Sequence, residues 1–565
     1  MTTRLLRTPS MASPWFFATL IAFGLVSVQA QSATAQQKPV AVITVSSVNE
    51  LMQDAGFVGN LFGKAELVQM YKPMILGMTE GLDHSKPIGM IVQTDGMNPG
   101  GALCIPVTDL KKLLGKVVGF GISSEDKGDG MLEISVGGEN MIAKEAGGWA
   151  YITSKPHMLE GLPADPNELF ADLTNDYDIG IRLHVQNIPE EYRELAIQQL
   201  QQGMEAGFQQ GGQIPEDLEQ GKALAQLQIQ QLAQLINEAD EVTLGIALDG
   251  EQQRALIDFA LTAVPGSELA TQMNEQMTAQ KTNFAGFFQP DAAMMMSVVG
   301  KVSEKDKAQI DQMFDVVSKQ ISDAMEKEAS LPSQEARDLA QSAIEDFLQA
   351  FKATLQAGMM DGGAVVNLAP NSLTLVAGGF VGDPSKVESG VKKLAELAEE
   401  EPEFPGVKWN AESHGDVNFH TLNMPIPADE EEPRQLFGDE VSVAVGIGSK
   451  SAFFALGRDC VEAVKAVMDA SAAEPGKTVP PFEMTFALKQ IMEVAATFAD
   501  ENEQPQLEDI ANMLATQATG RDHVRIVLQP IDNGFRYRFE AEEGVLRSIG
   551  MAIEAERNQE VGAGF

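Results

Sequence analysis

The stretch Glu241–Ala263, EVTLGIALDGEQQRALIDFALTA, decides how the rest of the chain is interpreted. Two apolar runs flank Asp249-Gly250, a dipeptide that accepts the positive φ angles of a tight hairpin turn. Before the turn, apolar residues alternate with smaller or polar ones, as they do on a half-buried strand. Ser267 follows as a helix start. The stretch therefore predicts a β-hairpin and then a helix.

The same plan returns three more times along the chain. Further hairpins are predicted from Ile88, Gly362 and His523, each followed by an amphipathic helix. A strand and two helical stretches precede every hairpin, so each unit has the order strand, helix, helix, hairpin, helix. The four units span 39–118, 177–280, 289–400 and 481–558.

A different kind of segment separates the units in pairs. Residues 119–163 lie between the first two units, and residues 403–472 occupy the matching place between the last two. Four units in the same order, with matching inserts, indicate internal repetition. The chain therefore divides into two tandem halves, 38–283 and 284–558, followed by a short tail at 559–565.

The inserts also match in detail where each one ends. WAYITSK, residues 149–155, aligns with AFFALGR, residues 452–458, as an apolar strand, a small residue and a cation before a helix. Trp149 and Tyr151 fall on one face of the strand, and this alignment places Phe454 on the corresponding face. We expect that face to meet the helices, which makes Trp149 a core residue.

These patterns predict an α+β fold. Strict alternation within strands favours antiparallel sheets with one covered face, and the many amphipathic helices would supply the cover. We therefore expect antiparallel sheets with helices packed mainly on one face, built by tandem duplication of β-α-α-β-β-α units. The length of 565 residues is typical of three or four domains.

The beginning of the chain predicts export. Arg4 and Arg7 precede an apolar run from Trp15 to Val28, and Ala33-Thr34-Ala35 provides a cleavage site, so residues 1–35 are interpreted as a signal peptide. An uncleaved membrane anchor is the alternative, although the run is shorter than the roughly 20 residues that span a bilayer. We expect a periplasmic or extracellular protein without stable membrane insertion after signal cleavage.

Charge and cysteine content narrow the possible partners. The net charge of −41 argues against nucleic acid and anionic membrane surfaces, and an acidic surface that keeps the protein soluble explains it more simply than a cationic partner. The two cysteines, Cys104 and Cys460, are too few for a disulfide framework. Because they occupy different places in the two halves, we expect them to be unpaired.

One short segment has residues of the kind that bind metals. In ESHGDVNFH, the residues His414, Asp416 and His420 are weak candidates for a metal site, since nitrogen and oxygen ligands would alternate along a strand. However, Gly415-Asp416 is typical of a hairpin turn, which would place His414 at the tip and His420 in mid-strand. We therefore predict no metal, catalytic or cofactor-binding site, and no cofactor.

Apart from these residues, the sequence contains no chemical motif with the required context. Ser124 and Lys127 have S-x-x-K spacing, but they lie in a segment that is expected to be a polar turn. The 27 methionines favour gap filling between helices and sheet, and an adaptable groove for an apolar ligand is the alternative.

The signal peptide, the repeated hairpin–helix units and the junction WAYITSKPHMLEGL, residues 149–162, together support a comparison with a known group. In these features the chain resembles a family of uncharacterised exported proteins from planctomycete-type bacteria. The resemblance implies export and a repeated architecture, and it implies no activity and no site residues.

Three classes of function remain compatible with the sequence. The first is a soluble, non-enzymatic binding or scaffold protein of the periplasm or cell envelope, whose partner would be an envelope protein. The second is a carrier of lipids or other apolar ligands in a groove between sheet and helices. The third is a hydrolase with an unrecognised site. We favour a protein that is not an enzyme, because repetition enlarges a surface without creating a unique pocket.

Overall fold

The computed structural model describes residues 38–94, 99–118, 121–128, 130–210, 217–327, 333–369, 371–501 and 503–562. Helices account for 43% and strands for 35%, and the sheet is antiparallel, which confirms the α+β class. The predicted signal peptide lies outside the described residues. Within the ranges described, no helix is both long and apolar enough to cross a membrane.

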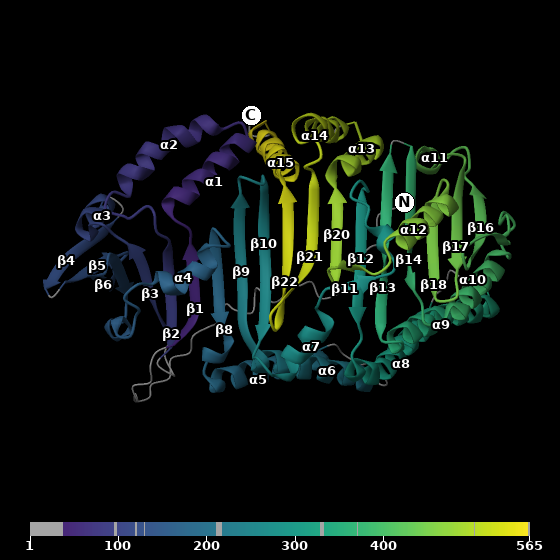
Figure 1. The fold of residues 1–565 in the computed structure, drawn as a ribbon, viewed down its shortest axis with the longest axis horizontal. Helices are drawn as coiled ribbons and strands as arrows, with labels where there is room; N and C mark the ends of the chain where they lie inside the picture. Colours follow the sequence, from purple (N-terminus) through teal and green to yellow (C-terminus); the bar gives the residue numbers. More distant parts are fainter. Residues whose placement is uncertain are drawn as a thin grey trace.

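Twenty strands form one continuous sheet, which Figure 1 shows face-on. The first half of the chain supplies ten neighbouring strands. From the outer edge inward they are β4 (Ile122–Gly128), β5 (Met131–Val136), β6 (Glu139–Ala146), β7 (Trp149–Thr153), β3 (Pro99–Pro106), β2 (Ile88–Thr94), β1 (Pro39–Val45), β8 (Ile179–His184), β9 (Ala239–Asp249) and β10 (Arg254–Ala263).

The second half of the chain supplies the other ten strands. From the opposite edge inward they are β15 (Lys408–His414), β16 (Val417–Pro425), β17 (Glu440–Ile447), β18 (Ser451–Gly457), β14 (Ser372–Phe380), β13 (Met359–Ala369), β12 (Met294–Lys301), β20 (Phe482–Ala487), β21 (His523–Ile531) and β22 (Gly534–Glu542). Two short strands, β11 (Gln280–Thr282) and β19 (Lys477–Val479), pair separately.

The succession of strands is the same from either edge of the sheet. Four insert strands come first, then the hairpin and opening strand of one unit, and then the opening strand and hairpin of the next. The two sets of ten strands meet where β10 pairs with β22, and Asp258 lies opposite Arg538 there. The halves therefore share one sheet and do not form separate sheets.

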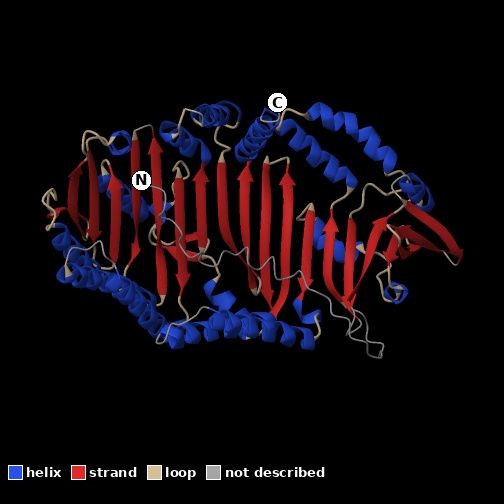
Figure 2. Ribbon diagram, turned by 180° about the vertical axis from the view of Figure 1, so that it is seen from behind, coloured by secondary structure: helices blue, strands red, loops and turns tan. Residues whose placement is uncertain are grey.

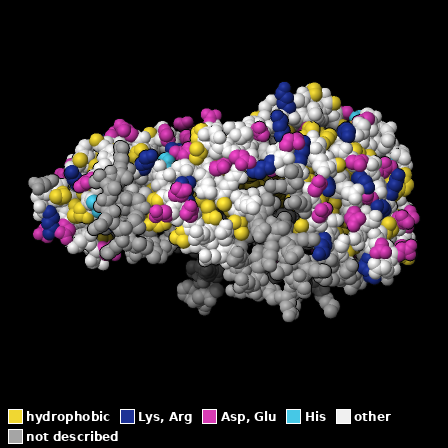
Figure 3. All heavy atoms as spheres, turned by 90° about the horizontal axis from the view of Figure 1, so that it is seen from below, with side chains coloured by type: hydrophobic (Ala, Val, Ile, Leu, Met, Phe, Trp, Pro, Cys, Tyr) yellow, Lys and Arg dark blue, Asp and Glu magenta, His cyan; other side chains and the backbone are white. Residues whose placement is uncertain are grey.

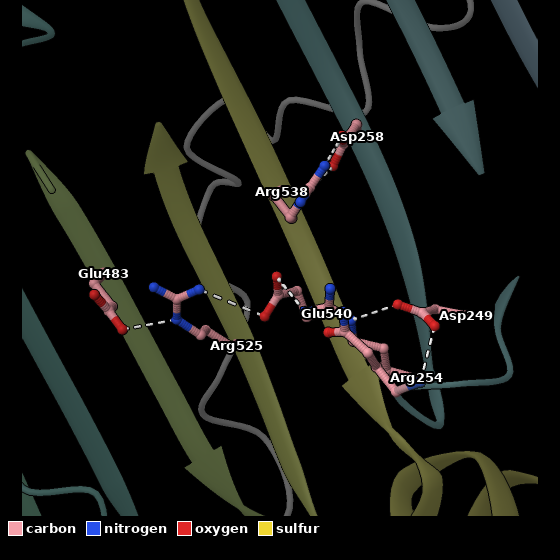
Figure 4. A network of polar contacts seen from close by, with 8 residues as sticks. Asp249, Arg254, Asp258, Glu483, Arg525, Arg538 and Glu540 are labelled. Atoms are coloured by element: carbon pink, nitrogen blue, oxygen red, sulfur yellow. Dashed lines mark hydrogen bonds and ion pairs between the residues drawn. The ribbon is translucent and has the colours of Figure 1, made fainter. Parts of the chain in front are cut away.

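A buried ion pair joins the two halves at this junction. The carboxylate of Asp258 is completely buried and accepts hydrogen bonds from Nε and Nη2 of Arg538, at 2.9 and 2.8 Å. It also accepts a 2.8 Å hydrogen bond from the hydroxyl of Tyr177. Arg525 bonds Glu483 nearby on the same side of the sheet (Figure 4). A buried carboxylate is tolerated here because several donors surround it.

The helices of the first half are α1 (Val48–Leu61), α2 (Ala65–Met78), α3 (Leu110–Val117), α4 (Asn167–Thr174), α5 (Glu190–Gln210), α6 (Asp217–Glu238) and α7 (Glu268–Gln276). Those of the second half are α8 (Glu304–Lys327), α9 (Gln334–Gln356), α10 (Pro384–Ala398), α11 (Glu431–Phe437), α12 (Cys460–Ala473), α13 (Leu488–Phe498), α14 (Gln504–Gln517) and α15 (Glu543–Gly562). Single 3₁₀ turns occur at Pro156–Leu159, Val185–Asn187 and Ala285–Phe287.

Local capping chemistry explains where several helices begin. Ser47 caps α1 in a capping box with Glu50, and Ser267 caps α7 as predicted. Asp383 and the first-turn proline Pro384 start α10. By contrast, the expected tail at 559–565 is wrong in part, because α15 continues to Gly562.

Helices meet the sheet on both faces and along both strand ends. The buried cluster around Leu110 and Leu114 places α3 on one face of the first half, and α10 covers the same face of the second half, over Val443 and Val445. On the other face, α4 packs on β1 and β8, and α12 packs on β14 and β18. The remaining helices run mainly along the ends of the strands, as Figure 2 shows from behind.

The hairpin at Asp249 has a wider turn than the sequence predicts. β9 and β10 are joined through residues 250–253, and the positive φ belongs to Gln253 at 56° rather than to Gly250. Oδ1 of Asp249 accepts a 2.8 Å hydrogen bond from the backbone N–H of Gln252. This side-chain bond stabilises a longer loop in place of the two-residue turn.

The segment expected to be a polar turn is instead the edge strand β4. Its residues Ser124 and Lys127 are exposed, as is almost the whole of this strand. At the opposite edge, most of β15 is exposed as well, including Lys408 and Glu412. Charged edge strands resist pairing with another chain, so polarity here reflects the position in the sheet and not a break in it.

The predicted core position of Trp149 is confirmed. Its side chain is 1% exposed and meets Phe170 of α4 edge-on, with ring centroids 6.0 Å apart. The predicted counterpart is wrong by one residue, because Phe453 is the buried aromatic and Phe454 is 43% exposed. A shift of one residue exchanges the two faces of a strand, so a small alignment error inverted this assignment. The two cysteines are free and buried.

Candidate functional site

One face of the sheet carries large hydrophobic side chains that remain accessible to solvent, and we call it the apolar face. On β10, Ile257 and Phe259 lie on this face, and Asp258 between them lies on the other. Ile257 is 47% exposed, and Phe539 opposite it on β22 is 38% exposed. The well-exposed members of this face are Met90, Leu103, Val136, Ile179, Ile181, Ile246, Ile257, Met424, Phe454, Tyr537 and Phe539.

Directly paired residues on this face form an unbroken row across the strands from β2 to β16, which we call the apolar row. At a strand spacing of about 4.8 Å it extends roughly 60 Å. In order, its members are Ile88, Val45, Ile179, Ile246, Ile257, Phe539, Ile526, Met484, Met296, Ala364, Ala377, Phe454 and Val445, and the row ends at His420.

The opposite face of the same central strands is polar. Arg254 bonds Asp249 and Glu540 there, and the Asp258–Arg538 pair lies on this side as well (Figure 4). The contrast between the faces means that the exposed hydrophobic residues of these central strands lie on one side of the sheet. A contiguous exposed apolar surface of this kind marks a site of interaction.

Among the described elements, helices border the apolar face along the two ends of the strands and leave its middle open (Figure 2). At one end, Leu235 of α6 and Met273 of α7 pack beside Phe259 and Leu261 of β10. In the view from below, acidic side chains are scattered over the surface, in keeping with the negative net charge (Figure 3). The apolar face is therefore bordered by helices on a molecule with an acidic surface.

Toward the end of the apolar row, α10 packs over the face and borders a partly open cavity of about 590 Å³. Its walls come from α9, α10, the loop after α10 and strands β14, β16, β17 and β18. Hydrophobic side chains dominate the lining, which includes Phe347, Val387, Val391, Leu394, Phe404, Val407, Leu422, Val443, Val445 and Phe454. This volume lies within the range of small-molecule sites in proteins.

A polar pocket of about 520 Å³ adjoins this cavity on the outer side of α10. Ala395 and His420 line both spaces, so the two adjoin at these residues. The remaining lining of the polar pocket consists of Glu388, Lys392, Glu396, Glu399, Trp409 and Asn410. An apolar cavity with a charged pocket beside it has the general shape of a site for an amphiphile.

His420 is the polar side chain at the boundary between the two spaces. It is 3% exposed, and its Nδ1 accepts a 3.0 Å hydrogen bond from the backbone N–H of Asn410. Burial lowers the pKa of the imidazole below its usual value, which favours the neutral ring. The ring of Trp409 meets it edge-on, with centroids 5.0 Å apart. The protein therefore holds a neutral histidine in a fixed orientation.

The structure does not bring the candidate metal ligands together. Nε2 of His414, at the end of β15, bonds Asp469 of α12 at 2.7 Å, whereas His420 lies on the apolar face under α10. Asp416 lies in the hairpin turn and accepts a bond from the backbone N–H of Ser449. Within the described ranges, no group of three or more His, Cys, Asp or Glu residues is arranged to hold a metal ion.

Another polar group with altered acidity lies where α1 meets the sheet. Burial, and then the charge of neighbouring Asp178, raise the pKa of Asp54 to about 7. Oδ2 of Asp54 is buried without a hydrogen-bond partner among the described residues. The hydroxyl of Ser46 donates a 3.5 Å hydrogen bond to Asp178 of this carboxyl pair.

Sequence reasoning did not find the cavity or the polar pocket. Their residues come from α9, α10 and four strands that are distant along the chain, and each residue by itself is ordinary. The methionine content was the signal that pointed in this direction, and Met296 and Met484 do lie in the apolar row. Comparison with protein-family models, with curated proteins and with solved structures finds no match to this chain.

Proposed function

We propose that the protein is a non-enzymatic binding protein for amphiphiles, whose acyl chains lie against the apolar face. The apolar row is the observation that carries this proposal. It places Ile257, Phe539 and Phe454 in contact with solvent on one side of the sheet, and the opposite side of the central strands is polar. Removing such surface from water contributes about 25 cal/mol per Å².

The shape of the apolar row supports an acyl chain as the occupant. One chain of a membrane lipid covers about half of the ~30 Å hydrocarbon core, so a row of roughly 60 Å has room for several chains. Methionines such as Met296 and Met484 adapt to chains of different shape. The partly open cavity beside α10 has room for a narrow apolar group, and it is too small for a folded partner.

Among the function classes compatible with the sequence, this proposal combines an exported, non-enzymatic binding protein with a lipid-like ligand. We also propose that the mature protein acts outside the cytoplasm, because residues 1–35 have the pattern of a signal peptide. A tandem duplication of the two halves forms part of the proposal. It is supported by the identical succession of strands from either edge of the sheet.

Binding of the apolar dye N-phenyl-1-naphthylamine to the purified protein tests the proposal. We expect dye fluorescence to rise on binding, and Ile257→Lys to weaken the affinity about tenfold, because an ammonium group in the row would have to be desolvated under the ligand. Ile257 is 47% exposed, so the substitution should leave the fold intact. The matched control is Gln252→Lys, which adds the same charge at an exposed turn position of the same hairpin.

Equal dye affinity of Ile257→Lys and Gln252→Lys would overturn the proposal. Native mass spectrometry of protein purified from its own envelope provides a second measurement, in which we expect bound masses of lipids. A lipid-free dimer, or a stoichiometric protein partner that blocks the dye, would instead identify the apolar face as a protein interface.

A further inference from the structure

We propose that the cavity and the polar pocket at α10 form a specific site for an acyl ester with a zwitterionic head group, in which Nε2 of His420 donates a hydrogen bond to the ester carbonyl. This inference rests on the proposed binding of acyl chains. The chain would enter the apolar cavity, the carbonyl would lie at the boundary, and the head group would occupy the polar pocket.

The tautomer of His420 follows from its one described hydrogen bond. Nδ1 accepts the backbone N–H of Asn410, so the neutral ring carries its proton on Nε2. No hydrogen bond joins Nε2 to another described group, and the residue lines both spaces. A ring N–H that lines a cavity and has no described partner is available to an acceptor on a ligand.

The backbone that fixes His420 is itself unusual. Asn410 has a φ of 50°, in the left-handed region that residues other than glycine seldom adopt. The pairing of β15 with β16 is irregular between Lys408 and Glu412, so Asn410 lies in a bulge of the edge strand. Bulges and strained backbones recur where a protein directs a group toward a ligand. Here the irregularity directs the N–H of Asn410 to the imidazole.

The charges of the polar pocket select the head group. Glu388, Glu396 and Glu399 contribute three carboxylates, and Lys392 contributes one ammonium group, which pairs with Glu388 at 2.7 Å. This excess of negative charge repels anionic head groups and attracts an ammonium group. Trp409 supplies an aromatic face for a quaternary ammonium, since Lys392 already lies 5.9 Å from the centre of its ring.

The apolar row connects this site with the open face. Phe454 and Val445 belong to the row and also line the cavity, directly before His420. A chain held in the cavity is therefore continuous with the hydrophobic surface that extends across the sheet. The site differs from the rest of the row because it has a hydrogen-bond donor and a charged pocket, so it provides head-group selectivity that the open face lacks.

Isothermal titration with lysolipids of one chain length, below their micelle concentration, tests the site. We expect lysophosphatidylcholine to bind about tenfold more tightly than lysophosphatidylglycerol, because the pocket carries excess negative charge. The ether analogue of lysophosphatidylcholine lacks the carbonyl and should bind about fivefold more weakly than the ester, as expected for one hydrogen bond. His420→Leu should remove this difference, and His420→Gln, which keeps an N–H donor, should restore it in part.

A second variant keeps the test independent of substitutions at the buried histidine. Glu396→Lys combined with Glu399→Lys changes an exposed residue of α10 and the exposed residue at its C-cap, and it should shift the preference toward lysophosphatidylglycerol. Equal binding of ester and ether lipids, or an unchanged head-group preference in the lysine variant, would overturn the inference. If Ile257→Lys still weakens dye binding in that case, the proposed binding of amphiphiles to the apolar face is retained and only the specific site at His420 is rejected.

Discussion

Removing the carboxylate of Asp258 should destabilise the protein more than removing any exposed acid of the same network. Asp258→Ala leaves the guanidinium of Arg538 without its partner in a buried position, and the hydroxyl of Tyr177 loses its acceptor. Breaking a buried ion pair from one side costs about 3–5 kcal/mol. Arg536 also lies 3.5 Å from this carboxylate, so two cations would then be left near each other. We therefore expect Asp258→Ala to lower the free energy of unfolding by about 4–5 kcal/mol.

The matched control is Asp249→Ala on the same side of the sheet. Asp249 contacts Arg254 at 3.4 Å, and both side chains are 25% exposed. Solvent screens such a pair, and the variant also loses the turn bond from the N–H of Gln252, so it should cost about 1–2 kcal/mol in total. The double variant Asp258→Leu with Arg538→Met should recover much of the stability, because well-packed apolar residues often replace a buried pair without loss.

Urea unfolding of the full chain provides the assay. Trp149 reports on the first half and Trp409 on the second, and circular dichroism reports on the whole. Agreement among these signals is required before a single free energy is assigned to a chain of this length. If Asp258→Ala and Asp249→Ala lower the free energy of unfolding by the same small amount, the stability of the junction does not depend on the buried pair and the reasoning is refuted.

Three further predictions concern buried groups. Trp149→Ala should cost about 3–5 kcal/mol in urea unfolding, because a side chain that is 1% exposed leaves a cavity, and a loss under 1 kcal/mol would contradict its place in the core. Because the pKa of Asp54 is raised to about 7 in the folded protein, stability should fall as pH rises from about 4 through 7, by about 2 kcal/mol after allowance for solvent screening. Asp54→Asn should flatten this pH profile of stability. An unchanged profile would show that other titrating groups cause the pH dependence. Burial raises the pKa of Cys104 to about 12 and also raises that of Cys460, so a maleimide should label neither thiol in the folded protein and both after unfolding without reductant. Fewer than two labelled thiols after unfolding would indicate a disulfide.

Features that depend on neighbours in the chain were predictable from sequence. The cap at Ser267 and the first-turn proline at Pro384 act within one turn of helix, so local chemistry is sufficient to place them. Alternation identified the strands around Asp249, because a half-buried strand repeats every two residues. The same periodicity placed Trp149 and Tyr151 on one buried face.

Features that depend on contacts between distant segments were not predictable from sequence. Phe453 and Phe454 are adjacent and identical in type, and only the packing of α12 buries the first and leaves the second on the apolar face. His420 is an ordinary histidine in the sequence. It becomes a candidate donor because α10 covers β16 and because Asn410 of β15 fixes its ring.

The sequence by itself determined many of the secondary-structure elements and several helix caps, since these follow from periodicity and from hydrogen bonds over a few residues. The tertiary structure decided that twenty strands form one sheet, that β10 joins β22, and that the described helices leave the middle of the apolar face open. The physical reason is that alternation is the same whichever face is covered. Strand order, and with it the path of the apolar row to His420, depends on pairings between residues that are hundreds of positions apart, and these leave no local pattern.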